Sequence, residues 1–557
     1  MSSDLHQNQN NSKTKDTSVG PSDVGPKQPS LKPLLDERRA QLREEMLKQG
    51  LDAVIHFSTR EHSQPSLWIL GAACKSDCHY AFVTPDATGV LEMPWRIAGL
   101  KPRLHTEEQL VPVAGAHLMP EALKAFCTER GVKRIGVIGD APFTHLEKLP
   151  AEIVNLNDRF APQVSAQVSP EVPVGMTARS SLDTLDQFPL TQADRDFLAG
   201  RLDSLREEIA KSGVDAALLY GTDRKGQYAR WLTAVPTVSE SEIIVVTPTA
   251  VKIFDIACDK NLDHKRAYPV EHYSFSSREE MQEALKRELE GASTLGVVKE
   301  FPYGDLMPLS AGKKLQNING TIGELMAIKS PQELGIIRHS SRDLATLMEE
   351  SLAKLTKGMN GKELEAVLDE RITLCGSTRS FPIGVAADGD LKGQYATTLA
   401  EPLYTQEIHE AVCIDMGIQY AGLVTDATRM GFIGNPPIKA EYERLRGVVR
   451  AVIACIKPGQ TVRDFLFSMK ASLADAGFDV KTLGVEELGH GVGFDLHEPP
   501  FLAIEEHLDM VFKPGMVVCI EPEVKTRWGS IRVEEVVEIT ATGAEILTKP
   551  WGYSKAA

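Results

Sequence analysis

The sequence lacks the features that mark a membrane or secreted protein. It has no run of about 18 consecutive apolar residues, the length that a membrane-spanning helix needs. The N-terminal stretch MSSDLHQNQNNSKTKDTSVGPSDVGPKQPS contains no apolar core of signal-peptide length. We therefore expect a cytoplasmic protein with no membrane partner.

Clustered positive charge is also missing. Lysine and arginine form no basic run, and the formal net charge is −16. Because contacts with phosphates need clustered cations, this balance argues against nucleic acid as a partner. A peptide or a small molecule is the expected substrate.

The eight cysteines include no Cys-x-x-Cys pair and form no regular framework. They indicate reduced structural thiols rather than a disulfide scaffold. The 557 residues, of which 42% are hydrophobic and 25% charged, are typical of a globular protein. This length predicts roughly three or four domains.

Two segments in the first half of the chain repeat one design. LREEMLKQGLDAVIHF, which starts at Leu42, aligns without a gap with LREEIAKSGVDAALLY, which starts at Leu205, an offset of 205 − 42 = 163. At the same offset Trp68 falls on Trp231, a pair that we interpret as core packing. Each copy is predicted to hold an amphipathic helix, a glycine turn, several strands, a second helix and a final strand. Two copies of this length indicate the duplication of a whole α/β domain.

A longer region with mixed elements follows the two copies. Ser330 and Pro331, with Glu333 shortly after them, predict the start of a long helix. Further helices are expected in KELEAVLDERITLCG, AEYERLRGVVRAVIACI and VRDFLFSMKASLADAG. Strands are expected around EAVCIDMGIQY, AGLVTDATRMGFI, MVVCIEP and IRVEEVVEIT. This mixture predicts an α+β domain.

These patterns divide the chain into four parts. Residues 1–32 are rich in Ser, Asn, Gln, Lys, Gly and Pro, so we expect a disordered tail. Residues 33–185 and 186–325 hold the two copies, and residues 326–557 hold the α+β domain.

Four acidic residues interrupt segments that are otherwise apolar strands. Asp415 and Asp426 lie on either side of a Tyr-Ala-Gly turn, so both side chains can project onto one face of an antiparallel hairpin. Glu521 and Glu534 interrupt two later strands. His490 lies in GHGVGFDLHEPP, which is too glycine-rich for a helix and too irregular for an ordinary strand. Each residue alone is more simply explained as solvated or packed.

Taken together, the four acids and the histidine predict a metal site. Carboxylates that converge inside a fold repel one another unless a cation neutralises them. Oxygen donors with a single imidazole suit Mn²⁺, Fe²⁺, Co²⁺ or Zn²⁺, and bridging carboxylates allow two ions to share the set. Four neighbouring acids are interpreted as ordinary solvated side chains: Asp495, Glu498, Glu535 and Glu538.

The order of these residues resembles a known signature. Asp415, Asp426 eleven positions later, His490 in GHGVG, Glu521 in IEP and Glu534 in RVE resemble the dinuclear metal signature of the pita-bread metallopeptidases, which include methionine aminopeptidase, aminopeptidase P and prolidase. The resemblance runs from MAIKSPQELGIIR to near the C-terminus, and the two upstream copies resemble creatinase-type N-terminal domains. It implies an α+β fold in which a pita-bread catalytic domain follows two creatinase-N-like α/β domains, most like the three-domain Xaa-Pro aminopeptidase.

The resemblance also implies a cofactor. Two divalent metal ions are expected, with Mn²⁺ as the first choice and Fe²⁺, Co²⁺ or Zn²⁺ as the others. Asp415 would bind one ion in bidentate fashion, and Asp426 and Glu534 would bridge both. His490 and Glu521 would complete the shell of the second ion, and the glycines around His490 would let the backbone pass close to the metals.

A reaction follows from the same resemblance. A hydroxide held between the two ions would attack an amide carbonyl, and the protein would remove an N-terminal residue or split a dipeptide next to proline. Glu521 would carry the proton to the leaving nitrogen, while His497 would contact the substrate and stabilise the oxyanion. A homodimer is the expected assembly.

Two positions depart from the family pattern. Proline-directed members carry a further histidine upstream of the first metal-binding aspartate, but none lies between Phe381 and Thr398, where Gln394 or Tyr395 takes its place in contact with substrate. Glu523 replaces the glycine that commonly follows the IEP motif. These departures keep two alternatives open. One is a hydrolase or lyase that acts on a small non-peptide metabolite, as creatinase and ectoine hydrolase do, and the other is a catalytically silent relative that binds peptides or proteins.

Overall fold

The computed structural model describes most of the chain between residues 32 and 550. The described residues are 32–58, 68–70, 79–94, 97, 100–101, 104, 108–113, 118–139, 141–157, 160, 183–221, 227–237, 239, 241–256, 260–298, 301–381, 383–387, 407–480, 488–503 and 507–550. The predicted tail lies outside them except for Lys32, and so do Gln394 and Tyr395. Among the described residues, no helix is both long and apolar enough to cross a bilayer.

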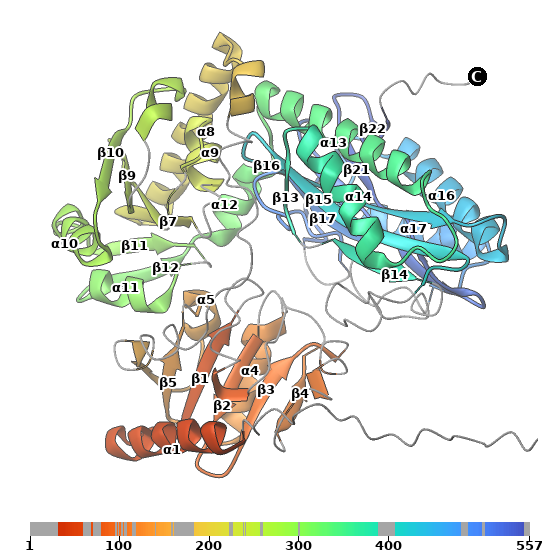
Figure 1. Cartoon of the computed structure of the whole chain (residues 1–557). Coiled ribbons are helices and arrows are strands. Elements are labelled where there is room, and N and C mark those ends of the chain that lie inside the picture. The colour runs from red at the N-terminus through yellow and green to blue at the C-terminus, as the bar shows by residue number, and fades with distance from the viewer. Residues whose placement is uncertain are drawn as a thin grey trace, which may run out of the picture.

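The first domain, in the lower part of Figure 1, is a six-stranded sheet with the strand order β4-β3-β2-β1-β5-β6. Its strands are β1 Ala53–Ser58, β2 His79–Val83, β3 Thr88–Glu92, β4 Gln109–Pro112, β5 Arg134–Ile138 and β6 Glu152–Asn155. Its helices are α1 Lys32–Gln49, α4 Met119–Glu129 and α5 Phe143–Leu146. Apolar residues of α1 pack on one face of the sheet and those of α4 on the other. We expected the copy to end with the strand β5, but a further strand, β6, follows it.

The second domain has the same topology, with the order β10-β9-β8-β7-β11-β12. Its strands are β7 Ala216–Gly221, β8 Glu242–Val246, β9 Val251–Ile256, β10 Glu271–Phe275, β11 Thr294–Val297 and β12 Lys314–Asn317. Its helices are α8 Gln192–Lys211, α9 Gln227–Thr233, α10 Arg278–Glu288 and α11 Tyr303–Ser310, with 3-10 turns at Asp183–Gln187 and Lys260–Lys265. The shared strand order confirms the predicted duplication. Trp68 and Trp231 are both buried, as core packing requires.

Equivalent segments of the two copies join the domains to each other. Pro142 and Pro302 form an antiparallel β-bridge. Beside it, the amide of Phe143 donates to the carbonyl of Phe301 at 2.9 Å, and the amide of Tyr303 donates to the carbonyl of Ala141 at 3.0 Å. Each partner segment follows the same strand of its own copy, so the contact is pseudo-symmetric.

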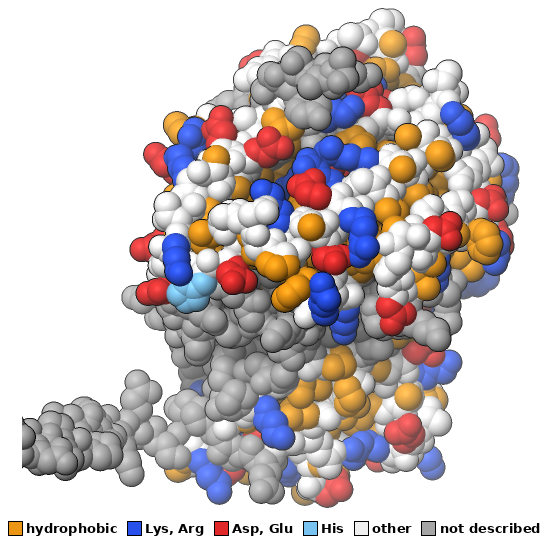
Figure 2. All heavy atoms as spheres, turned by 90° about the vertical axis from the view of Figure 1, so that its right-hand side faces the viewer, with side chains coloured by type: hydrophobic (Ala, Val, Ile, Leu, Met, Phe, Trp, Pro, Cys, Tyr) orange, Lys and Arg blue, Asp and Glu red, His pale blue; other side chains and the backbone are white. Residues whose placement is uncertain are grey.

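The described part of the C-terminal domain contains two four-stranded sheets and one two-stranded sheet, covered by long helices (Figure 1). One sheet has the order β13-β15-β14 with β16 paired to β15, the other has the order β17-β18-β21-β22, and β19 pairs with β20 alone. Helix α12 Asn319–Met326 ends the second domain and packs on α8, and the helices of the C-terminal domain are α13 Pro331–Leu352, α14 Gly361–Leu374, α16 Pro437–Cys455 and α17 Val462–Asp475. The strands are β13 Thr378–Arg379, β14 Gly384–Ala387, β15 Ala411–Tyr420, β16 Leu423–Phe432, β17 Gly489–Gly491, β18 Val517–Ile520, β19 Glu523–Thr526, β20 Gly529–Arg532, β21 Glu535–Ile539 and β22 Ala544–Ile546. Side chains of both charge signs are interspersed on the face shown in Figure 2.

Local sequence signals predict the start of α13 correctly but not the strands near the C-terminus. Ser330 caps α13 by accepting from the amide of Glu333, whose side chain accepts from the Ser330 amide in return, which is the predicted capping box. The segment IRVEEVVEIT, expected as one strand, is instead split. Its first part pairs with β19 and its second with β18, so the chain changes partners at Val533 and Glu534. The histidine stretch also contains a short strand, β17, because Gly489–Gly491 pairs with β18.

Candidate metal centre

The hairpin of β15 and β16, here called the acid hairpin, brings the two predicted aspartates together. Its turn residues Ala421 and Gly422 have φ angles of 48° and 76°, as a tight two-residue hairpin turn requires. Asp415 lies opposite Thr428, and Asp426 lies opposite Gly417. The two aspartates are therefore diagonal neighbours on one face of the hairpin.

All five predicted metal ligands meet at this face. Ligand oxygens of Asp415, Asp426 and Glu534 lie within 4.8 Å of one another. His490 Nε2 lies 3.4 Å from Glu521 Oε1 and 4.0 Å from Asp426 Oδ2. The residues come from four separate parts of the chain, so only the fold brings them together.

Burial dominates the electrostatics of the cluster. It raises the pKa of Asp415, and it raises the pKa values of Asp426 and Glu534 well above their usual range, with neighbouring carboxylates adding to the effect in each case. Asp426 Oδ1 and Glu534 Oε1 are buried and have no hydrogen-bond partner among the residues that the structure describes. Two such oxygens are costly to leave unpaired. Their positions and chemistry fit divalent cations that prefer oxygen and imidazole donors.

Arg532 is a member of the site to which the sequence reasoning gave no role. Its Nη1 lies 2.9 Å from Glu521 Oε2 and 3.3 Å from Asp415 Oδ2. Its Nε lies 4.0 Å from Oε2 of Glu523, the residue directly opposite it on β19. The sequence could have indicated this role, since Arg532 is the one basic residue in the acidic segment IRVEEVVEIT. The extra negative charge of Glu523 therefore lies beside a cation.

Neighbouring polar groups orient the candidate ligands. Thr428 Oγ1 donates to Glu534 Oε2 at 2.8 Å. His490 Nδ1 lies 3.0 Å from the carbonyl of Gly491, so a proton on Nδ1 leaves Nε2 free to face the acids. Cys519, opposite His490 on β18, groups with His490 and Glu534 within 4.8 Å and was also missed from sequence. Burial raises the pKa of its thiol well above the usual range.

His497 lies beside the cluster at the protein surface. Its side chain is exposed, and its ring meets that of His490 edge to face with 4.2 Å between centroids. This placement suits a group that contacts a substrate rather than a buried ligand. Gln394 and Tyr395 lie outside the described residues, so their expected contact with substrate stays a prediction.

The glycines around His490 make room for neighbouring backbone. A Cβ on Gly489, whose φ is 145°, would meet the carbonyl oxygen of Cys519 at 1.9 Å, and one on Gly491 would meet that of Pro499 at 2.4 Å. The nearest atoms thus belong to β18 and to the end of the same loop. We expected these glycines to bring the backbone close to the metals, whereas the structure shows close packing between segments.

Three acids that we interpreted as solvated are buried. Glu498, Glu535 and Glu538 are 3%, 0% and 4% exposed, and each is paired with a cation. The pairs are Glu498 with Lys329, Glu535 with Arg429, and Glu538 with Arg338. Their partners lie between 106 and 200 positions away in the sequence, beyond the reach of a local pattern. Asp495 is half-buried.

Comparison with known proteins identifies the C-terminal domain. Residues 335–541 match the model of metallopeptidase family M24. The chain is similar to the Xaa-Pro dipeptidase of Pyrococcus horikoshii, with 24% identity over 363 residues that cover 64% of this chain and 98% of that protein. It is also similar to the Xaa-Pro dipeptidase of Pyrococcus furiosus, with 26% identity over 294 residues that cover 49% and 78%.

Solved structures share the architecture. The crystal structure of the P. horikoshii prolidase matches with a TM-score of 0.55 at 22% identity, covering 63% of this chain and 98% of that one. The X-Pro aminopeptidase of Thermotoga maritima matches with a TM-score of 0.52 at 19% identity, covering 62% and 97%. At these identities the likeness is one of fold. Residues 335–541 therefore form a domain of metallopeptidase family M24 with the expected pita-bread fold, and α/β domains precede it in the chain.

Proposed function

We propose that this chain is a metal-dependent peptidase that cleaves short substrates next to proline, removing an N-terminal residue or splitting a dipeptide. The observation that carries the proposal is the convergence of three carboxylates, one of which also groups with the imidazole of His490, with two buried carboxylate oxygens left without a partner among the described residues. A domain without metal chemistry has no reason to bury such a set.

Five side chains would hold two divalent cations: Asp415, Asp426, His490, Glu521 and Glu534. When bound, such cations activate water for attack and polarise the scissile carbonyl. The metal is proposed to be Mn²⁺ first, although Fe²⁺, Co²⁺ and Zn²⁺ suit the same donors.

Three side chains would carry out the remaining steps. Glu521 would accept the proton of the attacking water and deliver it to the leaving nitrogen. Its two oxygens are already oriented, one toward His490 and the other by Arg532. Exposed His497 would donate a hydrogen bond to the oxygen on which negative charge develops. The charge of Arg532 would oppose the rise that burial causes in the pKa of Asp415.

The substrate class rests on the relatives. Two proteins that this chain matches over most of their length are named Xaa-Pro dipeptidases. A homodimer and a cytoplasmic location stay predictions, as do contacts of Gln394 or Tyr395 with substrate.

The proposal is tested by metal analysis paired with peptide cleavage. The full chain is loaded with Mn²⁺, its metal content is measured, and release of alanine is followed from Ala-Pro, Ala-Pro-Ala and the control Ala-Ala. Asp426→Ala removes a candidate ligand. Asp509→Ala is the matched control, because this aspartate is exposed and its one ion pair among the described residues is with surface Arg463.

We expect about two ions per chain and cleavage of the proline substrates, with both lost in Asp426→Ala and kept in Asp509→Ala. Two ions without cleavage of any of these peptides would overturn the substrate class and favour a small metabolite. A chain that binds no metal would overturn the mechanism and favour a silent binding domain.

A further inference from the structure

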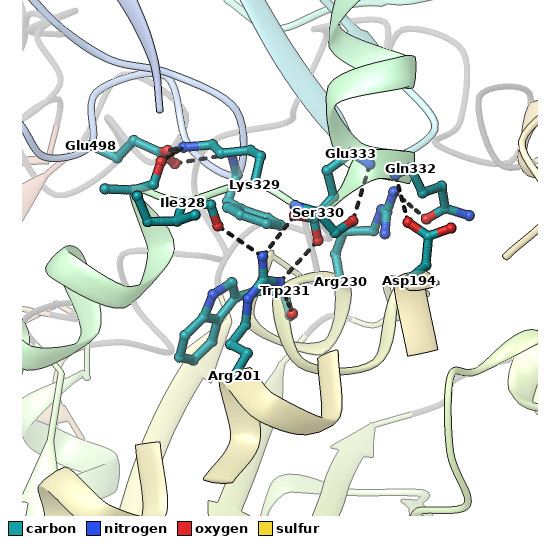
Figure 3. A network of polar contacts seen from close by, with 12 residues as sticks. Asp194, Arg201, Arg230, Trp231, Ile328, Lys329, Ser330, Gln332, Glu333 and Glu498 are labelled. Atoms are coloured by element: carbon teal, nitrogen blue, oxygen red, sulfur yellow. Dashed lines mark hydrogen bonds and ion pairs between the residues drawn. The ribbon is translucent and has the colours of Figure 1, made fainter. Parts of the chain in front are cut away.

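An arginine of the second domain holds the segment that leads into the catalytic domain (Figure 3). Arg201 on α8 donates to both carboxylate oxygens of Glu333, at 2.9 and 2.8 Å, and to the carbonyl of Ile328 at 3.0 Å. Glu333 also accepts from the amide of Ser330 at 2.7 Å. The guanidinium therefore ties both ends of residues 328–333, and the Arg201 and Glu333 side chains are almost wholly buried.

Lys329, within this tied segment, reaches the loop that carries both histidines. Residues 489–500 are here called the histidine loop. Lys329 Nζ forms a buried ion pair with Glu498 Oε1, and Glu498 Oε2 accepts from the amides of Phe494 and Asp495 at 3.0 and 3.1 Å. The Glu498 carboxylate thus joins the loop to the segment held by Arg201.

Glu498 also closes the loop through its backbone. Its amide donates to the carbonyl of Gly491 at 3.0 Å, and the Gly491 amide donates back to its carbonyl at 2.7 Å. Gly491 follows His490, and Glu498 follows His497. A shift of Glu498 would therefore move both histidines, whose rings are in contact.

A second arginine holds the acid hairpin. Arg230 on α9 is fully buried and donates from Nε to the carbonyl of Ala421, in the turn of the hairpin, at 3.1 Å. Its Nη2 lies 3.3 Å from Gln332 Oε1 on α13. The hairpin and the histidine loop are also linked directly, since the Val424 amide donates to the carbonyl of Gly493 at 2.7 Å. The apolar core of the second domain continues without a break to Ala421 and Phe494.

We propose that the second α/β domain is a positioning scaffold for the catalytic site. Arg201, acting through Lys329 and Glu498, fixes the histidine loop, and Arg230 fixes the acid hairpin. Buried ion pairs add little net stability over apolar contacts. However, their hydrogen bonds are directional, so they hold the paired segments in one relative position. For its catalytic consequence the inference rests on the proposed function, whereas its structural consequence does not.

The test uses charge-removing variants of the full chain: Glu498→Gln, Lys329→Met and the double variant that combines them. Glu538→Gln is the matched control, because Glu538 is equally buried and its carboxylate pairs with Arg338 on α13, with no hydrogen bond or ion pair to the histidine loop among the described residues. Amide hydrogen exchange of peptides from 488–503 is measured together with kcat, KM and the thermal midpoint.

We expect Glu498→Gln to speed exchange in the histidine loop about 10-fold or more and to lower kcat about 10- to 100-fold, with KM changing less than about threefold, because small misplacements of catalytic groups are costly. Glu538→Gln should lower the thermal midpoint without either effect. The double variant should recover thermal stability relative to the single variants, since no lone charge stays buried, yet keep the low kcat.

A further variant, at Arg201, tests whether the second domain is the source of the order in the histidine loop. Arg201→Lys keeps the charge but loses the two-pronged contact, and it should also speed exchange in the histidine loop. If Glu498→Gln and Glu538→Gln give the same exchange in the loop, the positioning role is overturned, whatever the enzyme cleaves. If the wild-type chain cleaves no proline peptide while the exchange pattern holds, only the proposed function fails.

Discussion

Arg532 and Glu521 form a close ion pair at the centre of the acidic cluster, with Nη1 2.9 Å from Oε2. The same nitrogen lies 3.3 Å from Asp415 Oδ2. Arg532 therefore supplies positive charge to the acids without any metal, and it opposes the rise in the pKa values of Asp415, Asp426 and Glu534 that burial causes.

Removing this charge should matter most when metal is absent. We expect Arg532→Gln to lower the free energy of unfolding of the metal-free protein by about 1–3 kcal/mol, because buried carboxylates lose their cation, and by less once divalent ions are bound. Urea unfolding with a chelator and with Mn²⁺ measures both values. Arg527→Gln is the control, because Arg527 lies in the turn between β19 and β20, the strand that carries Arg532, and its guanidinium lies over the Trp528 ring. Equal losses in the two variants would contradict the role of Arg532.

Sequence patterns predicted the parts of this site that depend on local order. The two aspartates share a face because their hairpin has a two-residue turn, and alternation along strands then sets the side of each residue. Similarly, the duplication was visible because β1 and β7, β2 and β8, and β3 and β9 keep the offset of 163 residues. Such features can be predicted from the sequence because they depend on residues that are close together in the chain.

The features that sequence missed depend on contacts between distant segments. Glu498 and Lys329 lie 169 positions apart, so nothing near Glu498 indicates that it is buried. Arg532 stands beside Asp415 only because two strands from different sheets meet. The break in IRVEEVVEIT has the same origin, since each half finds a different partner strand. Tertiary pairing decides such cases, and local propensity does not.

The hydroxyl of Thr428 should strengthen metal binding by holding Glu534. We expect Thr428→Val to weaken the affinity for Mn²⁺ about 10- to 100-fold, as loss of a hydrogen bond to a ligand does elsewhere. Competition with a chelator measures the affinity. Thr425→Val is the matched control, because this threonine is buried on the same strand but donates to the carbonyl of Ile418. A similar affinity in both variants would show that the contact with Glu534 has no such role.

Gly489 should tolerate no side chain. In Gly489→Ala the new Cβ would meet the Cys519 carbonyl oxygen at 1.9 Å, so β17 must move away from β18 and take His490 with it. We expect Mn²⁺ affinity to fall about 10-fold or more, measured by equilibrium dialysis. Gly434→Ala has a similarly unfavourable φ of 71° but open space around its Cβ. It should lose only about 1–2 kcal/mol of stability and bind metal normally. Normal binding by Gly489→Ala would refute the explanation.

Glu242, in the second domain, should make stability depend on pH. Burial, reinforced by the negative charge of Asp255, raises its pKa from 4.5 to about 8. Between these values the folded state holds a proton that the unfolded state has lost, so stability should fall as pH rises, by at most about 1.4 kcal/mol per pH unit.

Glu242→Gln copies the shape of the protonated acid and should remove this slope. Urea unfolding at pH 5, 6.5 and 8 should therefore show that the free energy of unfolding of the variant rises relative to that of the wild type as pH rises. This difference should stop growing above about pH 8, where the folded state also loses the proton. Glu290→Gln, on an exposed turn of the same domain, should follow the wild type at all three values. Parallel curves for wild type and Glu242→Gln would mean that Glu242 is already ionised in the folded protein, because the positive charge of Arg266, which lowers its pKa, then outweighs burial.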